Sequence, residues 1–188
     1  AGDGSIAVSG TSVSATGLNS RGINAVTDSG SVTIDMGSVQ TNGSPAVYAR
    51  GTDRVSVTAG TVSGGGIDVR QGGYVSSPPV LGQKGPLGIS APGDPGPLSA
   101  IGYGPGIYVD SDSVTGTGDN NPGINAVSAD GFVSITSGSV STNGANSDGI
   151  IADAYTDVAI DSGSVTTAGN DSSGILSTNR YGSITIDS

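Results

Sequence analysis

A pattern of short apolar pieces that returns about every 25 residues constrains the fold of this 188-residue chain more than any other feature. The first piece of each repeat alternates a β-branched residue with a polar one, as Val133 and Ile135 do. The second piece centres on one valine in Ser-Val-x-Thr or a variant, and the third reads Gly-Ile-x-Ala or a variant. Repeats of this length are typical of solenoids, because a single repeat cannot bury its apolar face until the next one stacks on it.

Equivalent residues can be assigned to each piece along most of the chain. The first piece carries Ile6/Val8, Val32/Ile34, Val55/Val57, Val133/Ile135, Val158/Ile160 and Ile184/Ile186, and the second carries Val13, Val39, Val62, Val140 and Val165. The third piece is marked by Gly22-Ile23, Ala46-Val47, Gly66-Ile67, Gly106-Ile107, Gly123-Ile124, Gly149-Ile150 and Gly174-Ile175. Because the pairs at 106 and 123 lie only 17 residues apart, we expect a missing or shortened strand and a changed cross-section between residues 107 and 122.

The alternation places valine and isoleucine on one face of each strand and polar residues on the other. Three strands per turn with short corners wind into a coil, and each strand then pairs in parallel with its copy one turn on. The 34 glycines and the absence of glutamate argue against helices and for tight turns. We predict an all-β, single-stranded parallel β-helix of about six or seven coils, right-handed as β crossovers are. An antiparallel sandwich would explain the many turns, but not why the same three pieces recur.

The repeat is interrupted once. Residues 1–70 and 106–188 are predicted to form coils of one continuous domain, and residues 71–105 to form an insertion rich in proline and glycine. Proline removes hydrogen-bond donors from a ladder, so this segment is expected to loop out from the coil or to lie across it. The apolar residues of the insertion would contact a partner or cover the side of the helix. A tether is the third option for this segment. The apolar residues are Tyr74, Leu81, Leu87, Ile89, Leu98 and Tyr103.

The charge of the chain narrows the range of partners. The formal net charge is −10, which repels the phosphates of nucleic acids and anionic lipids. No stretch of the sequence approaches the roughly 20 apolar residues of a membrane helix, so direct membrane insertion of this chain is not expected. The absence of cysteine is compatible with export.

Three aspartates beside the insertion are the best candidates for chemistry. Asp110 and Asp112 are two residues apart and so share one face of a strand, and Asp119 follows. Such carboxylates would serve as acid and base in glycoside hydrolysis or bind Ca²⁺. The alternative is that they satisfy backbone donors at corners, where aspartate is common in this chain. Since there is no histidine or cysteine to activate a hydroxyl, we predict no catalytic residues and no required cofactor, and Ca²⁺ is the cation that these aspartates would take.

Three threonines of the second piece raise a further alternative. Thr41, Thr142 and Thr167 occupy the equivalent place in their repeats and would suit an ice-binding face if they pointed outward. Alternation from the inward valine places them inside the coil instead, where we expect them to bond to their neighbours.

The Ser-Gly-Ser-Val stretches at 29–32, 137–140 and 162–165, together with the Gly-Ile-x-Ala strands, resemble the passenger regions of bacterial autotransporter adhesins. The resemblance extends over most of the chain and concerns architecture and composition. It implies export, display at the bacterial cell surface, and a role in adhesion, aggregation or biofilm formation. That family has no catalytic motif shared by all members, so the resemblance implies no site residues.

These expectations combine into a non-enzymatic, extracellular structural or adhesive β-solenoid. The expected partners are other copies of the chain, stacked end to end or laterally, and glycans or proteins of host or bacterial surfaces. Both ends of the chain stop within a repeat, and exposed parallel edges favour stacking into a fibre. The alternative is a carbohydrate-active β-helix, like a phage tailspike or polysaccharide lyase, that uses the three aspartates. An ice-binding solenoid is the third possibility.

Overall fold

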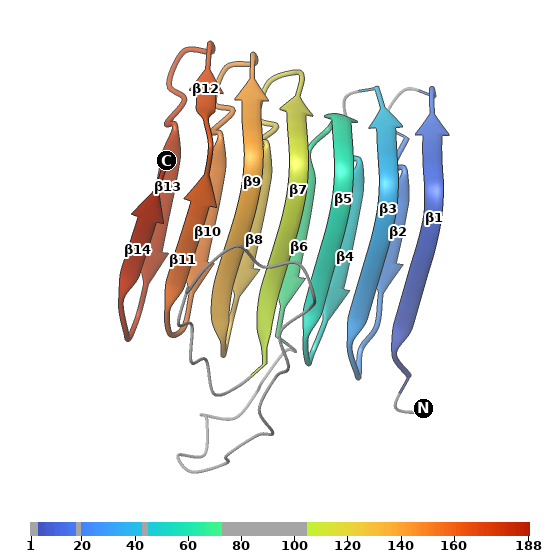
Figure 1. Cartoon of the computed structure of the whole chain (residues 1–188), viewed down its shortest axis with the longest axis vertical. Coiled ribbons are helices and arrows are strands. Elements are labelled where there is room, and N and C mark those ends of the chain that lie inside the picture. The colour runs from blue at the N-terminus through green and yellow to red at the C-terminus, as the bar shows by residue number, and fades with distance from the viewer. Residues whose placement is uncertain (1–3, 18–19, 43–44, 73–104) are drawn as a thin grey trace.

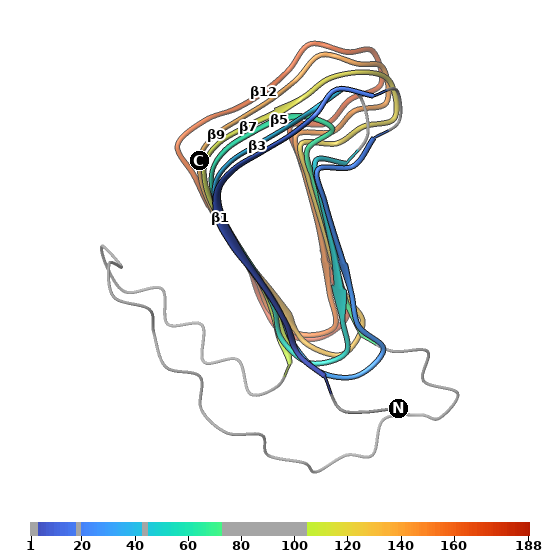
Figure 2. The ribbon, with the colours of Figure 1, turned by 90° about the vertical axis from the view of Figure 1, so that its right-hand side faces the viewer.

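The computed structural model describes residues 4–17, 20–42, 45–72 and 105–188, and these residues form strands and corners with no helix among them. The strands are parallel and stack coil upon coil into a β-solenoid, which confirms the predicted parallel β-helix (Figure 1). Seen from the end that carries β1 (Ile6–Ala15), the chain runs clockwise as it recedes, so the coil is right-handed (Figure 2).

Two parallel sheets form the walls of the solenoid. After β1, the larger sheet continues in the order β3 (Val32–Thr41), β5 (Val55–Gly64), β7 (Gly106–Gly116), β9 (Phe132–Thr142), β11 (Val158–Ser162) and β14 (Ile184–Asp187), and β12 (Val165–Thr167) also pairs with β9. The smaller sheet contains β2 (Ile23–Val26), β4 (Val47–Gly51), β6 (Ile67–Gln71), β8 (Ile124–Ser128), β10 (Ile150–Ala154) and β13 (Ile175–Asn179). Each coil adds a strand to both sheets, so the described residues form six coils and the first strand of a seventh.

The first two pieces of most repeats form one bent strand instead of the two separate strands that we predicted. In β3, alternate residues point inward up to Met36, and the inward phase resumes at Val39. Gly37 lies at the bend and has no paired partner in the register between β1 and β3. A Cβ at Gly37 would lie 2.6 Å from the carbonyl oxygen of Thr11, so the bend needs glycine there. This bend gives the coil its three-sided cross-section (Figure 2).

The interior consists of rows of identical or similar side chains. One row runs through Val8, Ile34, Val57, Val109, Ile135, Ile160 and Ile186, which are successive partners in the larger sheet. The smaller sheet contributes the smaller residues Ala25, Ala49, Val69, Ala126 and Ala152. Burying one valine or isoleucine side chain contributes about 1.5–3 kcal/mol, so stability accumulates coil by coil.

The predicted loss of a strand after the insertion is wrong. Ile107 pairs with Val55 and Val133 of the larger sheet, so Gly106 and Ile107 begin a first strand and do not mark a third one. The coil that contains β7 and β8 is therefore complete. The dipeptide Gly-Ile does not identify the third piece by itself, because it occurs at the start of strands of both sheets in this chain.

The three Ser-Gly-Ser-Val stretches do not occupy one kind of corner either. Val32 begins β3, whereas Val140 lies in the second half of β9, beyond the bend at Gly138. β6 ends at Gln71 and β7 begins at Gly106, so the segment predicted as an insertion lies between these two strands in the sequence. The predicted contact residues Tyr74, Leu81, Leu87, Ile89, Leu98 and Tyr103 all lie outside the described residues.

Candidate functional site: a notch at the third coil

The corners that lead from the larger to the smaller sheet stack closely in coils 4 to 6. They span residues 117–123, 143–149 and 168–174. Each contains one residue other than glycine with a left-handed backbone, namely Asn120, Asn146 and Asp171. Asparagine and aspartate tolerate this conformation best after glycine. The backbone N–H of Asn120 donates to the carbonyl oxygen of Ala145 at 2.8 Å, which joins one corner to the next.

Ser147 holds this stack together from inside. It is fully buried, its hydroxyl accepts the N–H of Asn121 at 3.0 Å, and it donates to the carbonyl oxygen of Gly118 at 2.9 Å. Ser172 makes the equivalent bonds one coil further on, to the N–H of Ser147 and the carbonyl oxygen of Gly144. The seven-residue corner is therefore a repeated unit with its own internal bonding.

The corner of coil 3, between β5 and β6, contains only Gly65 and Gly66. Gly64 and Gly66 have φ values of 103° and 70°, and a Cβ at Gly66 would collide with the backbone of Pro122 and Gly123. The corner is nevertheless bonded on both sides. Gly64 accepts the N–H of Thr117 at 2.6 Å through its carbonyl oxygen, and Gly65 donates to the hydroxyl oxygen of Thr41 at 3.2 Å.

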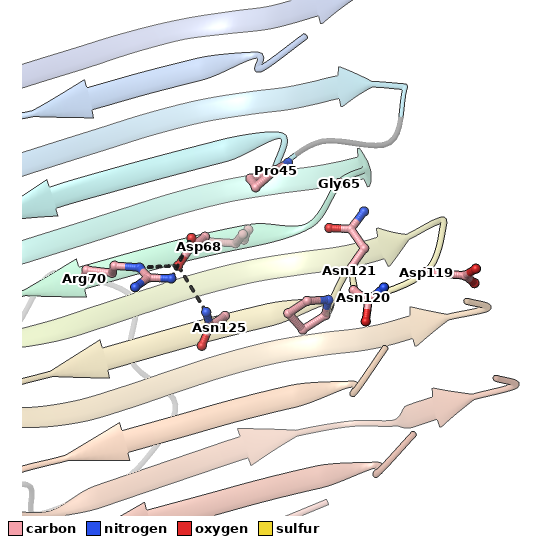
Figure 3. Close-up of a pocket in the computed structure, with 10 residues that line it drawn as sticks. Pro45, Gly65, Asp68, Arg70, Asp119, Asn120, Asn121 and Asn125 are labelled. Carbon is pink, nitrogen blue, oxygen red and sulfur yellow. Dashed lines mark hydrogen bonds and ion pairs between the residues drawn. The ribbon is translucent and has the colours of Figure 1, made fainter. Parts of the chain in front are cut away.

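The short corner stays lower than the corners after β7 and β9 (Figure 1), and a notch lies beside it. The notch has a volume of about 290 Å³ and opens to solvent. Pro45 borders it on the side of coil 2, and the corner of coil 4 borders it on the other side (Figure 3). Its lining residues are Pro45, Gly65, Ile67, Asp68, Arg70, Asp119, Asn120, Asn121, Pro122 and Asn125.

Three polar side chains on neighbouring strands make a hydrogen-bonded cluster in the notch (Figure 3). Asp68 of β6 is the ladder partner of Asn125 of β8, and Arg70 follows two residues later on the same outer face. The carboxylate oxygen Oδ1 of Asp68 accepts Nε–H of Arg70 and Nδ2–H of Asn125, both at 3.2 Å. The hydrogen bond to Asp68 raises the pKa of the Arg70 guanidinium above its ordinary value, while partial burial works against it. Asp68 and Arg70 therefore compensate each other's charge.

An aromatic residue lies beside this cluster on the outer face of the smaller sheet. Tyr48 of β4 is the ladder partner of Asp68 on the side opposite Asn125. The guanidinium carbon of Arg21 lies 4.8 Å from the centroid of its ring, a distance typical of a cation–π contact. The notch thus continues into a surface with polar and aromatic character.

The three aspartates considered in the sequence analysis do not form one site. Asp110 lies in β7 between Thr58 and Thr136, and Asp112 lies at the bend of the same strand, both exposed. Asp119 lies at the rim of the notch, where its Oδ1 accepts the backbone N–H of Ala145 at 2.8 Å, which is the corner role considered for it. In the described part of the chain, no three residues of the types His, Cys, Asp and Glu are grouped so that they could hold a metal ion.

The threonines of the second piece point inward, as the alternation predicts. Thr41 and Thr142 are buried, and the hydroxyl of Thr142 donates to the carbonyl oxygen of Ser147 at 2.6 Å. Thr167 is half-buried. These three side chains therefore do not form an exposed row.

The notch was not predicted from the sequence, although the sequence contains a signal for it. Val62 and Ile67 are five residues apart, whereas the equivalent Val114 and Ile124 are ten apart, so the third repeat is short at this corner. No part of the described structure is a helix long and apolar enough to span a membrane. Comparison with protein-family models, curated proteins and solved structures finds no match for this chain.

Proposed function

We propose that this chain is a non-catalytic structural and adhesive module of an extracellular bacterial surface protein. The observation that supports this proposal is the uninterrupted parallel ladder, in which strands of successive coils pair in register along the larger sheet. A stack of this kind is rigid along its axis, because bending it would break ladder hydrogen bonds in every coil at once. A rigid rod with a polar surface suits the task of holding a contact site away from a cell.

Surface display tests the adhesive role. The chain is fused to an outer-membrane anchor in a non-adherent bacterium, and attachment to glass and to a glycan-coated surface is measured under flow together with cell settling. The control is the Ile135→Asp variant displayed at equal density, since a charge in the inner row breaks the ladder. We expect the native chain to increase attachment or settling. Equal behaviour of cells with the native chain, the variant or the anchor alone would contradict the proposal.

A further inference from the structure

We propose that the notch at coil 3 binds neutral glycans, with Asp68, Arg70 and Asn125 hydrogen-bonding neighbouring hydroxyl groups of one sugar. This inference names a ligand class for the adhesive role proposed above and rests on that role. The shape of the notch, the chemistry of its polar cluster and its charge support this assignment.

The notch opens to solvent, so a sugar can enter it from outside the coil. Pro45 and Pro122 supply apolar ring surface on opposite sides, against which the C–H faces of a sugar can pack. Glycans need such a mixed lining, because a sugar carries hydroxyl groups at its edge and C–H groups on its faces.

The walls of the notch are ordered before any ligand arrives. Asn121 is buried, its Nδ2–H donates to the carbonyl oxygen of Thr117 at 2.8 Å, and its backbone N–H donates to Ser147. Asp68 and Asn125 lie on paired strands of the ladder. A preorganised site loses little conformational entropy on binding, which matters for a ligand that offers mainly hydrogen bonds.

The polar cluster matches the needs of hydroxyl groups. A hydroxyl both donates and accepts, so a site for two adjacent hydroxyls needs acceptors and donors side by side. The Asp68 carboxylate accepts, the Arg70 guanidinium donates, and the Asn125 amide does both. Arg70 uses Nε and Nη2 toward Asp68, and its side chain is 51% exposed, so further N–H groups face solvent. The bonds among the three side chains fix their spacing.

The charge of the notch selects neutral ligands over acidic ones. The positive charge of Arg70 is compensated by Asp68, and Asp119 at the rim adds a negative charge. The chain as a whole carries a formal charge of −10. A phosphate, sulfate or uronate would meet repulsion and would have to separate Arg70 from Asp68.

The test is an NMR titration of the ¹⁵N-labelled chain with three neutral oligosaccharides, namely maltotetraose, cellotetraose and chitotetraose, and with tetragalacturonate as the acidic probe. We expect at least one neutral probe to shift the amides of Gly65, Asp68, Asn121 and Asn125 in a saturable way, with a dissociation constant in the millimolar range, and tetragalacturonate to bind more weakly.

Two variants remove the site in different ways. Asn125→Ala removes one polar group and is expected to weaken binding by about tenfold or more. A corner graft places a copy of residues 118–122 between Gly65 and Gly66, which restores the length found in coil 4 and is expected to abolish binding. The matched control is Asp153→Asn, which changes an exposed carboxylate on β10, where it accepts the Thr178 hydroxyl at 3.0 Å. This control is expected to bind as the native chain does.

The outcomes are separable. The proposal is overturned if none of the three neutral probes shifts the notch amides, if a folded corner-graft variant binds as well as the native chain, or if tetragalacturonate binds more tightly. If the notch fails these tests while displayed cells still attach, the glycan assignment is wrong and the adhesive role stands. If the notch binds glycan but displayed cells do not attach, the adhesive role is wrong.

Discussion

The corner between β5 and β6 consists of two glycines, whereas the corner between β9 and β10 consists of residues 143–149. The strands on either side of both corners nevertheless pair in the same register with their neighbours. The inward rows are thus maintained through a change of corner length. In this solenoid the ladder fixes the scaffold, and the corners are free to shape its surface.

The two corners satisfy their backbone groups by different means. The short corner depends on glycine conformations and on bonds to the adjacent coils through Thr41 and Thr117. The long corner instead encloses a buried hydroxyl, that of Ser147, which bonds to backbone groups in its own coil and in the preceding coil. The backbone N–H of Ser147 donates to the hydroxyl of Ser172 in the following coil. Substitutions that change backbone geometry should therefore disturb the short corner most. Removal of the Ser147 side chain should disturb the long corner most.

The largest loss of stability is expected from a substitution in the ladder of strands, which continues past both corners. Ile135 is 1% exposed and lies in the inner row between Val109 and Ile160. Ile135→Ala removes apolar contacts and leaves a cavity, so we expect the free energy of unfolding to fall by about 4 kcal/mol. Urea denaturation followed by circular dichroism measures the change. The control is Thr136→Ala on the exposed face of the same strand, and equal losses for the two variants would contradict a stability centred on the inner rows.

The next effect compares the short corner with the long corner between β7 and β8, residues 117–123, through a glycine at each: Gly64, which leads into the short corner, and Gly118. Gly64 has φ 103° and its added Cβ would collide with the carbonyl of Thr41, whereas Gly118 has φ 92° and no atom within 4 Å of the added Cβ. We expect Gly64→Ala to lower the free energy of unfolding by about 2–3 kcal/mol, through strain and collision together. Gly118→Ala is expected to cost about 1 kcal/mol from backbone strain alone. A similar cost for both variants in urea denaturation would show that the short corner is no tighter than the long one.

A smaller effect tests the hydroxyl inside the stacked corners. Ser147→Ala leaves the buried N–H of Asn121 without its acceptor, which is expected to cost about 1–2 kcal/mol. Ser172 makes equivalent bonds but is half-buried, so water can replace its hydroxyl and Ser172→Ala should cost less. Hydrogen exchange of the Asn121 and Ser147 amides reports each loss locally. Unchanged exchange at Asn121 in Ser147→Ala would rule out the bonding role assigned to this hydroxyl.

The sequence predicts the ladder well because period-two alternation translates directly into inward and outward positions. The inward rows of Ile34, Val39 and Ala49 follow from that rule, as does the inward direction of Thr41. The sequence-based assignment fails where the same dipeptide begins strands of different sheets. Gly106-Ile107 reads like the third piece, but it pairs with Val55, and only the register of the neighbouring strands decides between the two sheets.

The site could not be predicted in the same way, since it depends on residues that no local pattern connects. Asp68 and Asn125 are 57 residues apart, and the insertion between them conceals that they are ladder partners. The notch itself follows from a corner that is shortened to Gly65 and Gly66 in one repeat. Aligning Val62 and Ile67 on Val114 and Ile124 would have exposed the shorter corner, but not the polar cluster beneath it.

The smallest effect on stability is expected in the notch, where the polar cluster lies at the surface. The Asp68 side chain is 17% exposed and that of Arg70 is 51% exposed, so water and salt screen their attraction. A double-mutant cycle with Asp68→Asn and Arg70→Ala should give a coupling free energy of at most about 1 kcal/mol, lower still in molar salt. Urea denaturation of the four proteins measures it. A coupling of about 3 kcal/mol that persists in molar salt would make the pair a structural element of the short corner, whereas a small coupling agrees with side chains positioned for a ligand.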